Sequence, residues 1–245
     1  MNVELIQYTP DGINLIARLA RSTRMNELEQ EPEEISSISA ECGQTAIVTS
    51  EEYEEWCKKN EKFVKTLIKV KHFGVLEHVS FTFHISEISR ALTHQLVRHR
   101  MASYLQMSNR HAKPEKNGYV EPPIIKETSE LTPEEASGKQ ILLYDMYTVA
   151  LGEAYKFYEE LIKHGMKIED ARYVLPPAFF THITFTANLR TIIHFLELRL
   201  AHGSQWEIKE LAVKIFDLIY EIYPICLEEL KPLRDEAEDV LNKKM

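Results

Sequence analysis

Two segments far apart in the chain, residues 78–86 and 178–187, alternate between apolar and polar side chains and are rich in aromatic and β-branched residues. Alternation with period two predicts β-strands that bury one face. Each segment is followed at once by apolar residues at helical spacing, over residues 88–98 and 189–201. A few strands that pair across long, mainly helical connections are typical of the α+β class, and we therefore expect a single α+β domain.

The remaining predicted elements are mostly helical. Residues 3–9 alternate well enough for a short strand, whereas residues 102–109 fit either a strand or a helix. Two polar segments, about 27–45 and 113–139, are expected to be surface excursions, and the second ends in a helix-start signal at Thr132-Pro133. Further helices are expected over residues 13–24, 49–71, 140–163, 168–174 and 204–223, with a polar helix in the tail.

Composition narrows the function classes. The chain has 245 residues, of which 44% are hydrophobic and 27% are charged, so it can bury a core as one large domain. Its 8 glycines form neither G-x-G-x-x-G nor a phosphate loop, which excludes the standard dinucleotide fingerprint and the usual NTPase loop. No apolar run approaches the ~18 residues that span a bilayer. Residues 1–10 do not resemble a signal peptide, so we expect a cytoplasmic protein without membrane contact.

The cysteines and histidines give no sign of a metal site. Cys42, Cys57 and Cys226 lack the close spacing of metal or redox motifs, and an odd number of cysteines fits a reducing compartment. We interpret Cys57 and Cys226 as small buried hydrophobic residues. His78 and His84 would share one face of the predicted strand, but a third ligand is lacking, so structural histidines are favoured and no metal is expected.

The distribution of charge indicates a site for an anion. The formal net charge of −9 argues against a general nucleic-acid binder. Even so, residues 88–114 contain no Asp or Glu, although about four would be expected from the 38 acidic residues of the chain. Residues 171–196 form a second window without acids. Both windows carry arginines and histidines, and stretches of this kind are suited to holding an anion.

The densest cationic string is Arg98-His99-Arg100, at the end of a predicted helix. Three adjacent basic side chains repel one another in a low dielectric and need a counter-anion or full solvation. In the second window Arg190 and His194 share a helix face, and Asn188 lies where the strand turns into that helix. A solvated basic patch with ordinary helix caps is the alternative interpretation, and these residues alone leave it open.

The string Arg98-His99-Arg100, followed after seven residues by Ser108, resembles the signature of the flavin-dependent thymidylate synthases, the ThyX family. The similarity covers most of the chain, from about His72 to the helix after Gln205. It extends, in the family's order, to residues 77–84, 102–104, 171–176, 188–190, 195–199 and 205–208.

The resemblance implies a fold and an activity. The implied fold is an antiparallel sheet flanked by long helices, assembled as a homotetramer whose active sites are shared between subunits. The implied reaction is the reductive methylation of dUMP to dTMP, with methylenetetrahydrofolate as carbon donor, FAD as relay and NADPH as reductant.

The resemblance also implies site residues. It implies FAD contacts from His72, Gly74, Arg98, His99, Arg100, Gln106, Asn188, Leu189, Arg190 and His194. It implies dUMP contacts from Gln95, Leu96, Val97, Arg98, Gln106, Met107, Ser108, Asn109, Arg110, Arg172 and Arg199. Arg199 is implied to be the catalytic residue, which orients the uracil and favours its ionised ring. Ser108 is expected to position the nucleotide rather than to act as a nucleophile, because no base with the spacing of a triad is present.

Three positions depart from the family pattern. Gln106 stands where many members carry Glu, Gly74 where Ser or Thr is common, and His194 where some members have Asn. Residues from about 27 to 45 match poorly. The alternative function is an RNA- or nucleotide-binding module without catalysis, although the net acidity and the lack of an aromatic-rich RNA motif count against it.

Overall fold

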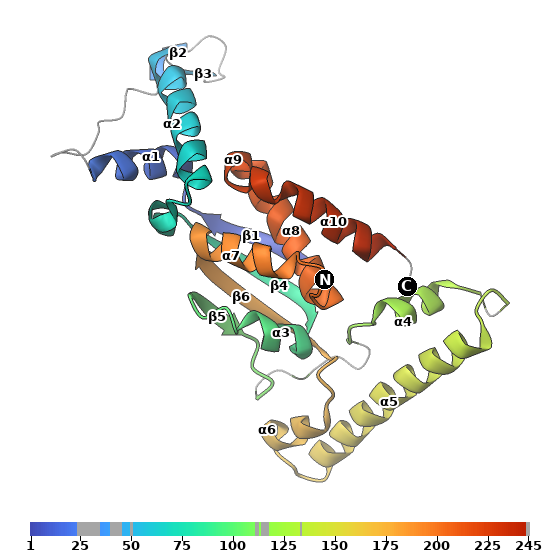
Figure 1. Cartoon of the computed structure of the whole chain (residues 1–245). Helices are drawn as coiled ribbons and strands as arrows, with labels where there is room; N and C mark the ends of the chain where they lie inside the picture. Colours follow the sequence, from blue (N-terminus) through green and yellow to red (C-terminus); the bar gives the residue numbers. More distant parts are fainter. Residues whose placement is uncertain are drawn as a thin grey trace.

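The computed structural model describes residues 1–23, 35–39, 46–49, 51–110, 113, 118–132 and 134–243. Its centre is a four-stranded antiparallel sheet with the strand order β1-β4-β6-β5 (Figure 1). Its strands are β1 (Asn2–Tyr8), β4 (Ser80–Ser89), β5 (Ala102–Gln106) and β6 (Phe180–Asn188). A separate antiparallel pair is formed by β2 (Ile35–Ser39) and β3 (Ala46–Thr49). The predicted α+β class with an antiparallel sheet is confirmed.

Along the chain, the helices lie between the strands or after the last strand. They are α1 (Gly12–Ser22), α2 (Glu51–Lys69), α3 (Arg90–Leu96), α4 (Pro123–Glu130), α5 (Gly138–Lys163), α6 (Ile168–Ala171), α7 (Leu189–Arg199), α8 (Trp206–Ile222), α9 (Pro224–Leu227) and α10 (Lys231–Asn242). Short 3₁₀ turns occupy η1 (Phe73–His78), η2 (Arg172–Val174) and η3 (Glu228–Leu230).

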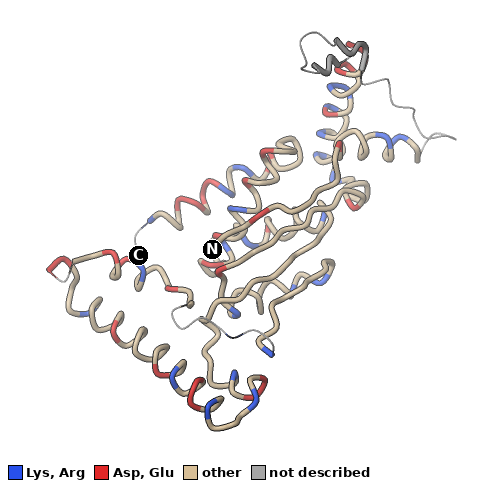
Figure 2. Tube along the Cα trace, turned by 180° about the vertical axis from the view of Figure 1, so that it is seen from behind, with Lys and Arg blue, Asp and Glu red and all other residues tan. Residues whose placement is uncertain are grey.

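Strands β4 and β6 are the two segments with the clearest alternation in the sequence, and they pair at the centre of the sheet. Phe83 lies opposite Phe185 and Phe81 opposite Ala187, and all four side chains are buried. The rings of Phe83 and Phe185 stack with their centroids 6.1 Å apart. Each such ring contributes about 1.5–3 kcal/mol on burial, so this row holds together two strands that are distant in sequence. Charged residues gather on the helices and are sparse along the strands (Figure 2).

Each central strand runs directly into a helix through a polar cap. The hydroxyl of Ser89 accepts the backbone N–H of Leu92 at 2.9 Å to begin α3, and the side chain of Asn188 accepts that of Thr191 at 2.9 Å to begin α7. Since β4 and β6 are antiparallel, these two helices start at opposite ends of the sheet. Residues 98–101, which follow α3, therefore return to the end where α7 begins.

Several predicted boundaries are wrong. Residues 35–39 form β2 rather than a loop, and the remainder of the predicted excursion at 27–45 lies outside the described residues. The second excursion contains α4. The long helix after it begins at Gly138, two residues before the predicted start at residue 140, because Ser137 and Gln140 form a capping box.

Two ambiguous assignments are resolved. The segment that fitted a strand or a helix begins with strand β5. His78 lies in η1, so it does not share a strand face with His84.

The cysteines differ in burial. Cys226 is buried as expected, and burial raises the pKa of its thiol to about 12. Cys57 is only half-buried, and Cys42 lies outside the described residues.

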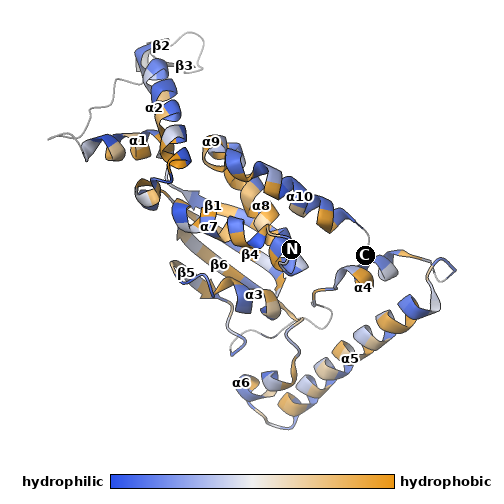
Figure 3. Cartoon of the chain, in the orientation of Figure 1, coloured by the Kyte–Doolittle hydropathy of each residue, from blue (hydrophilic) through white to orange (hydrophobic). Residues whose placement is uncertain are grey.

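Helix α5 stands apart from the sheet and contacts mainly α4, α6 and η2 (Figure 1). A small apolar cluster that includes Tyr155, Tyr158 and Phe179 holds its C-terminal half. Apolar and polar residues are mixed along the helix (Figure 3), and the side chains of Met146 and Phe157 are more than 60% exposed. Over the described residues, no helix combines the length and apolarity that crossing a bilayer requires.

Candidate active site

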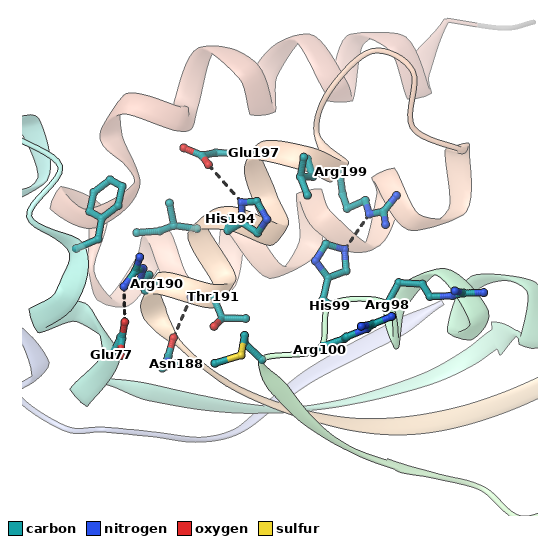
Figure 4. A pocket seen from close by; sticks show the side chains of 14 residues that line it. Glu77, Arg98, His99, Arg100, Asn188, Arg190, Thr191, His194, Glu197 and Arg199 are labelled. Atoms are coloured by element: carbon teal, nitrogen blue, oxygen red, sulfur yellow. Dashed lines mark hydrogen bonds and ion pairs between the residues drawn. The ribbon is translucent and has the colours of Figure 1, made fainter.

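A pocket of about 740 Å³ opens where the two acid-free windows meet. One wall is the turn of residues 98–101, between α3 and β5, and the other is the outer face of α7 (Figure 4). Phe73 and Glu77 of η1 close one end. The sheet topology creates this pocket, because it returns the end of α3 to the start of α7.

The pocket brings together many of the predicted site residues. Seven of them line it: Arg98, His99, Arg100, Asn188, Arg190, His194 and Arg199. His72 and Gly74 are exposed and flank the lining residue Phe73. A Cβ atom added to Gly74 would meet nothing within 4 Å, so the space beside this glycine is open.

The pocket has an excess of positive charge. Arg98 and Arg100 are exposed and have no carboxylate partner among the described residues. Arg190 forms an ion pair with Glu77. The imidazole Nδ1 of His194 lies 3.9 Å from a carboxylate oxygen of Glu197. Four guanidinium groups therefore face two carboxylates, an arrangement that favours an anionic ligand.

Arg199 is held by a histidine rather than by an acid. Its Nε donates to Nε2 of His99 at 3.0 Å (Figure 4). Burial, together with the charges of Arg199 and His194, lowers the pKa of His99 to about 4, so the ring is neutral near pH 7. A pairing between Arg199 and the nearby Glu197, the simplest surface alternative, does not occur. The terminal nitrogens of Arg199 have no partner among the described residues, which leaves them available to a ligand.

The other predicted nucleotide residues gather at the far end of β5. The guanidinium of Arg110 lies 2.9 Å from a carboxylate oxygen of Glu169, and Nε of Arg172 donates to the backbone oxygen of Glu169 at 2.9 Å. The backbone N–H of Arg110 also donates to the Ser108 hydroxyl at 3.3 Å. The five residues of β5 span about 15 Å, so this second cluster does not reach the pocket within one chain.

Several residues that were predicted to contact dUMP or FAD have side chains that are buried or lie outside the pocket. The side chains of Leu96 and Leu189 are fully buried in the core, and Val97 is exposed outside the pocket. Gln95 is half-buried on α3. The amide of Gln106 donates to two threonine hydroxyls, that of Thr93 at 3.0 Å and that of Thr181 at 3.4 Å. The binding roles of all these residues stay predictions.

The sequence did not single out some residues that organise the site. Arg90 donates to the backbone oxygen of Met107 at 3.1 Å and to the side-chain oxygen of Asn109 at 2.7 Å, and so holds the segment that carries Ser108. Burial and the charge of Arg172 lower the pKa of Arg90. Arg90 lies inside the first acid-free window, and this was the one available signal. Glu77 gave no signal of its pairing with Arg190.

Tyr104 is a further organising residue. Its hydroxyl lies 2.9 Å from the backbone oxygen of Leu96 and 2.8 Å from that of His99, and it can donate to either. Burial raises the pKa of this phenol to about 12, so the hydroxyl keeps its proton and remains a donor. Tyr104 thereby fixes the turn on which Arg98 and His99 lie.

Comparison with known proteins agrees with this geometry. A family model described as thymidylate synthase complementing protein matches residues 4–225. The chain is 36% identical over 234 residues to a flavin-dependent thymidylate synthase of Sulfurisphaera tokodaii, covering 95% of this chain and 78% of the relative. It is 36% identical over 250 residues to that of Saccharolobus solfataricus, covering 98% and 84%, and 34% identical over 236 residues to that of Geobacter sulfurreducens, covering 95% and 88%. Since the match spans the sheet, the pocket and the second arginine cluster, this chain belongs to the family of flavin-dependent thymidylate synthases.

Proposed function

We propose that this protein converts dUMP into dTMP by reductive methylation, with methylenetetrahydrofolate as carbon donor and NADPH as reductant. The observation that carries the proposal is the pocket between the 98–101 turn and α7. In a chain of this family it gathers the guanidinium groups of Arg98, Arg100, Arg190 and Arg199 from two distant parts of the sequence, and those of Arg98 and Arg100 have no carboxylate partner among the described residues. We infer a cytoplasmic location from the cysteine pattern.

The pocket suits FAD. Its volume of about 740 Å³ falls within the ~300–1,000 Å³ of most ligand sites. Arg98 and Arg100 are free of carboxylates among the described residues, and a planar guanidinium matches the oxygens of a phosphate. Asn188 and Arg190 would add polar contacts from the start of α7. A bound FAD would supply the redox chemistry through which the carbon unit and the reducing equivalents reach the pyrimidine.

Arg199 is the proposed catalytic residue. Its Nε is bound to His99, so the terminal nitrogens are the ones that can contact the uracil. Arg199 is half-buried, and a guanidinium in such surroundings stabilises negative charge on the ring more than it does in water. The stabilisation accelerates the reaction to the extent that this charge grows on the way to the transition state.

We also propose a homotetramer with shared active sites. The predicted dUMP residues fall into two clusters at opposite ends of β5, and a second copy could bring the Ser108 and Arg172 cluster to the pocket of the first. The exposed apolar residues of α5 offer a surface for such an assembly. Light scattering after size-exclusion chromatography tests this, and a monomer at micromolar concentration that is fully active would refute it.

The test of the whole proposal is a flavin absorption spectrum recorded with and without dUMP, together with tritium release from labelled dUMP. We expect purified protein that holds or takes up FAD, a spectral change on addition of dUMP, and turnover that requires methylenetetrahydrofolate and NADPH. Binding of dUMP by a colourless protein that gains no flavin absorbance would instead favour the non-catalytic nucleotide-binding module.

A further inference from the structure

The ring of His99 is held in one orientation by its neighbours. It is 8% exposed and packs edge-on against Phe195, with the ring centroids 5.0 Å apart and an interplanar angle of 76°. The backbone N–H of His99 donates to the oxygen of Leu96 at 3.1 Å, and the Tyr104 hydroxyl lies 2.8 Å from the oxygen of His99. A ring fixed in this way directs each of its two nitrogens toward one place.

The contact with Arg199 determines where the imidazole carries its proton. Nε of Arg199 lies 3.0 Å from Nε2 of His99. Arginine can only donate, so Nε2 must accept and the neutral ring must carry its proton on Nδ1. Burial and the charges of Arg199 and His194 lower the pKa of His99 to about 4, which keeps Nε2 free to accept near pH 7.

The same contact limits the freedom of Arg199. An unbound arginine side chain samples many rotamers, and ordering it on binding a ligand costs affinity. Here the Nε–H bond to His99 orders the side chain before any ligand arrives. The acid nearest in sequence, Glu197, lies beside His194 instead and does not compete for the guanidinium (Figure 4).

We propose that His99 is a positioning residue for Arg199: the imidazole accepts the Nε–H of Arg199 and thereby directs the terminal nitrogens of the guanidinium toward the nucleotide. The inference rests on the proposed function, in which Arg199 contacts dUMP. His99 also lines the pocket, and its Nδ1–H has no acceptor among the described residues. That proton is available to a ligand in the pocket. The same imidazole can therefore contact this ligand through Nδ1 and hold, through Nε2, the arginine that is proposed to contact the nucleotide.

Two substitutions separate the two nitrogens of His99. The side-chain oxygen of glutamine reaches the place of Nε2 and can accept from Arg199. Asparagine is shorter, so its amide lies near Nδ1 and leaves Arg199 without an acceptor. We expect His99→Asn to raise the Kd for dUMP about tenfold in the FAD-loaded protein, and His99→Gln to raise it much less. The Kd is measured by titrating dUMP while following the flavin spectrum.

A double-mutant cycle with Arg199→Ala is the deciding control. If His99 acts through Arg199, replacing His99 by Asn or by Gln has the same small effect on dUMP binding once Arg199 is gone. Equal weakening by Asn and Gln in the presence of Arg199, or effects that add to that of Arg199→Ala, would overturn the proposal. A purely structural defect would lower the melting temperature and would not distinguish Gln from Asn.

Nitrogen NMR of the wild-type protein with ¹⁵N-labelled histidine tests the same idea without a His99 variant. We expect His99 to show a protonated Nδ1 and an unprotonated Nε2 at pH 7, and to become a mixture of tautomers in Arg199→Ala. A proton on Nε2 in the wild type would refute the positioning role. This measurement needs neither FAD nor turnover, so it distinguishes failure of this inference from failure of the proposed function. Failure of the proposed function would appear as a wild-type protein that does not bind dUMP.

Discussion

Replacement of Arg199 by alanine should abolish most dTMP formation while leaving FAD bound. The Nε of Arg199 donates to His99, so in the proposed function the terminal nitrogens would contact the substrate. A unit charge about 4 Å from negative charge developing on the uracil is worth about 4 kcal/mol at the effective dielectric of a partly buried site. Each 1.36 kcal/mol is tenfold in rate, so the upper limit of the effect is about 10³-fold. Loss of one oxyanion donor in other enzymes costs about 10²–10³-fold, which agrees with this figure.

The assay is tritium release from labelled dUMP, recorded beside the flavin spectrum. FAD should be retained because Arg98, Arg100 and Arg190 are unchanged, and Lys214→Ala, which removes a half-buried cation of α8 outside the pocket, serves as the control. Arg199→Lys should rescue little, since a lysine has neither the planar fork nor an Nε–H directed at His99. Near-normal turnover of the alanine variant would refute the catalytic role. Loss of the flavin as well would show that Arg199 supports the structure of the pocket.

Three further predictions concern single residues of the site and its supports. Gln106→Glu should retain turnover with a modest rise in the KM for dUMP, because the threonine hydroxyls that now accept from the amide can turn to donate to a carboxylate; complete loss of activity in a folded protein would contradict this. Glu207→Ala should lower the free energy of unfolding, measured in urea titrations, by about 2–3 kcal/mol. The buried carboxylate of Glu207 accepts the backbone N–H of Ser89 at 2.8 Å and its hydroxyl at 2.6 Å, and the variant would leave that N–H unpaired. A change below about 0.5 kcal/mol would contradict this. Stability should also fall as the pH drops from about 6.5 toward 4, because the unfolded chain then takes up a proton that His99, with its pKa lowered to about 4, refuses in the folded state. Between pH 7.5 and pH 5 this term amounts to about 2 kcal/mol, and His99→Gln should remove it; identical pH profiles for the two proteins would rule it out.

Much of the fold could be predicted because its information is local. The alternating residues of β4 and β6 fix which side chains are buried, and the aromatic residues on those faces form the centre of the core. The caps at Ser89 and Asn188 lie where each strand ends and each helix begins. The start of the long helix α5 was predicted two residues late, at residue 140, because the sequence analysis marked Thr132 as the cap signal and did not single out Ser137, whose capping box begins the helix.

The arginine-bearing windows could likewise be identified from the sequence, since an absence of acids over many residues is a property of composition. The sequence by itself therefore determined strands β1, β4 and β6, the helices that follow β4 and β6, and the family. It also predicted that Arg98, His99, Arg190 and Arg199 belong to one candidate site, and all four line the same pocket.

The tertiary structure alone decided how these residues meet. Antiparallel pairing of β4 with β6 returns the end of α3 to α7, and this brings His99 within 3.0 Å of Arg199 although the two lie far apart in the chain. The same topology puts Arg110 at the other end of β5, beside Glu169. The tertiary structure also sets protonation states, because the low pKa of His99 arises from burial and from the charges of residues distant in sequence. Local pattern specifies which groups a chain carries, whereas distances and solvation depend on long-range packing, and these determine what the groups can do.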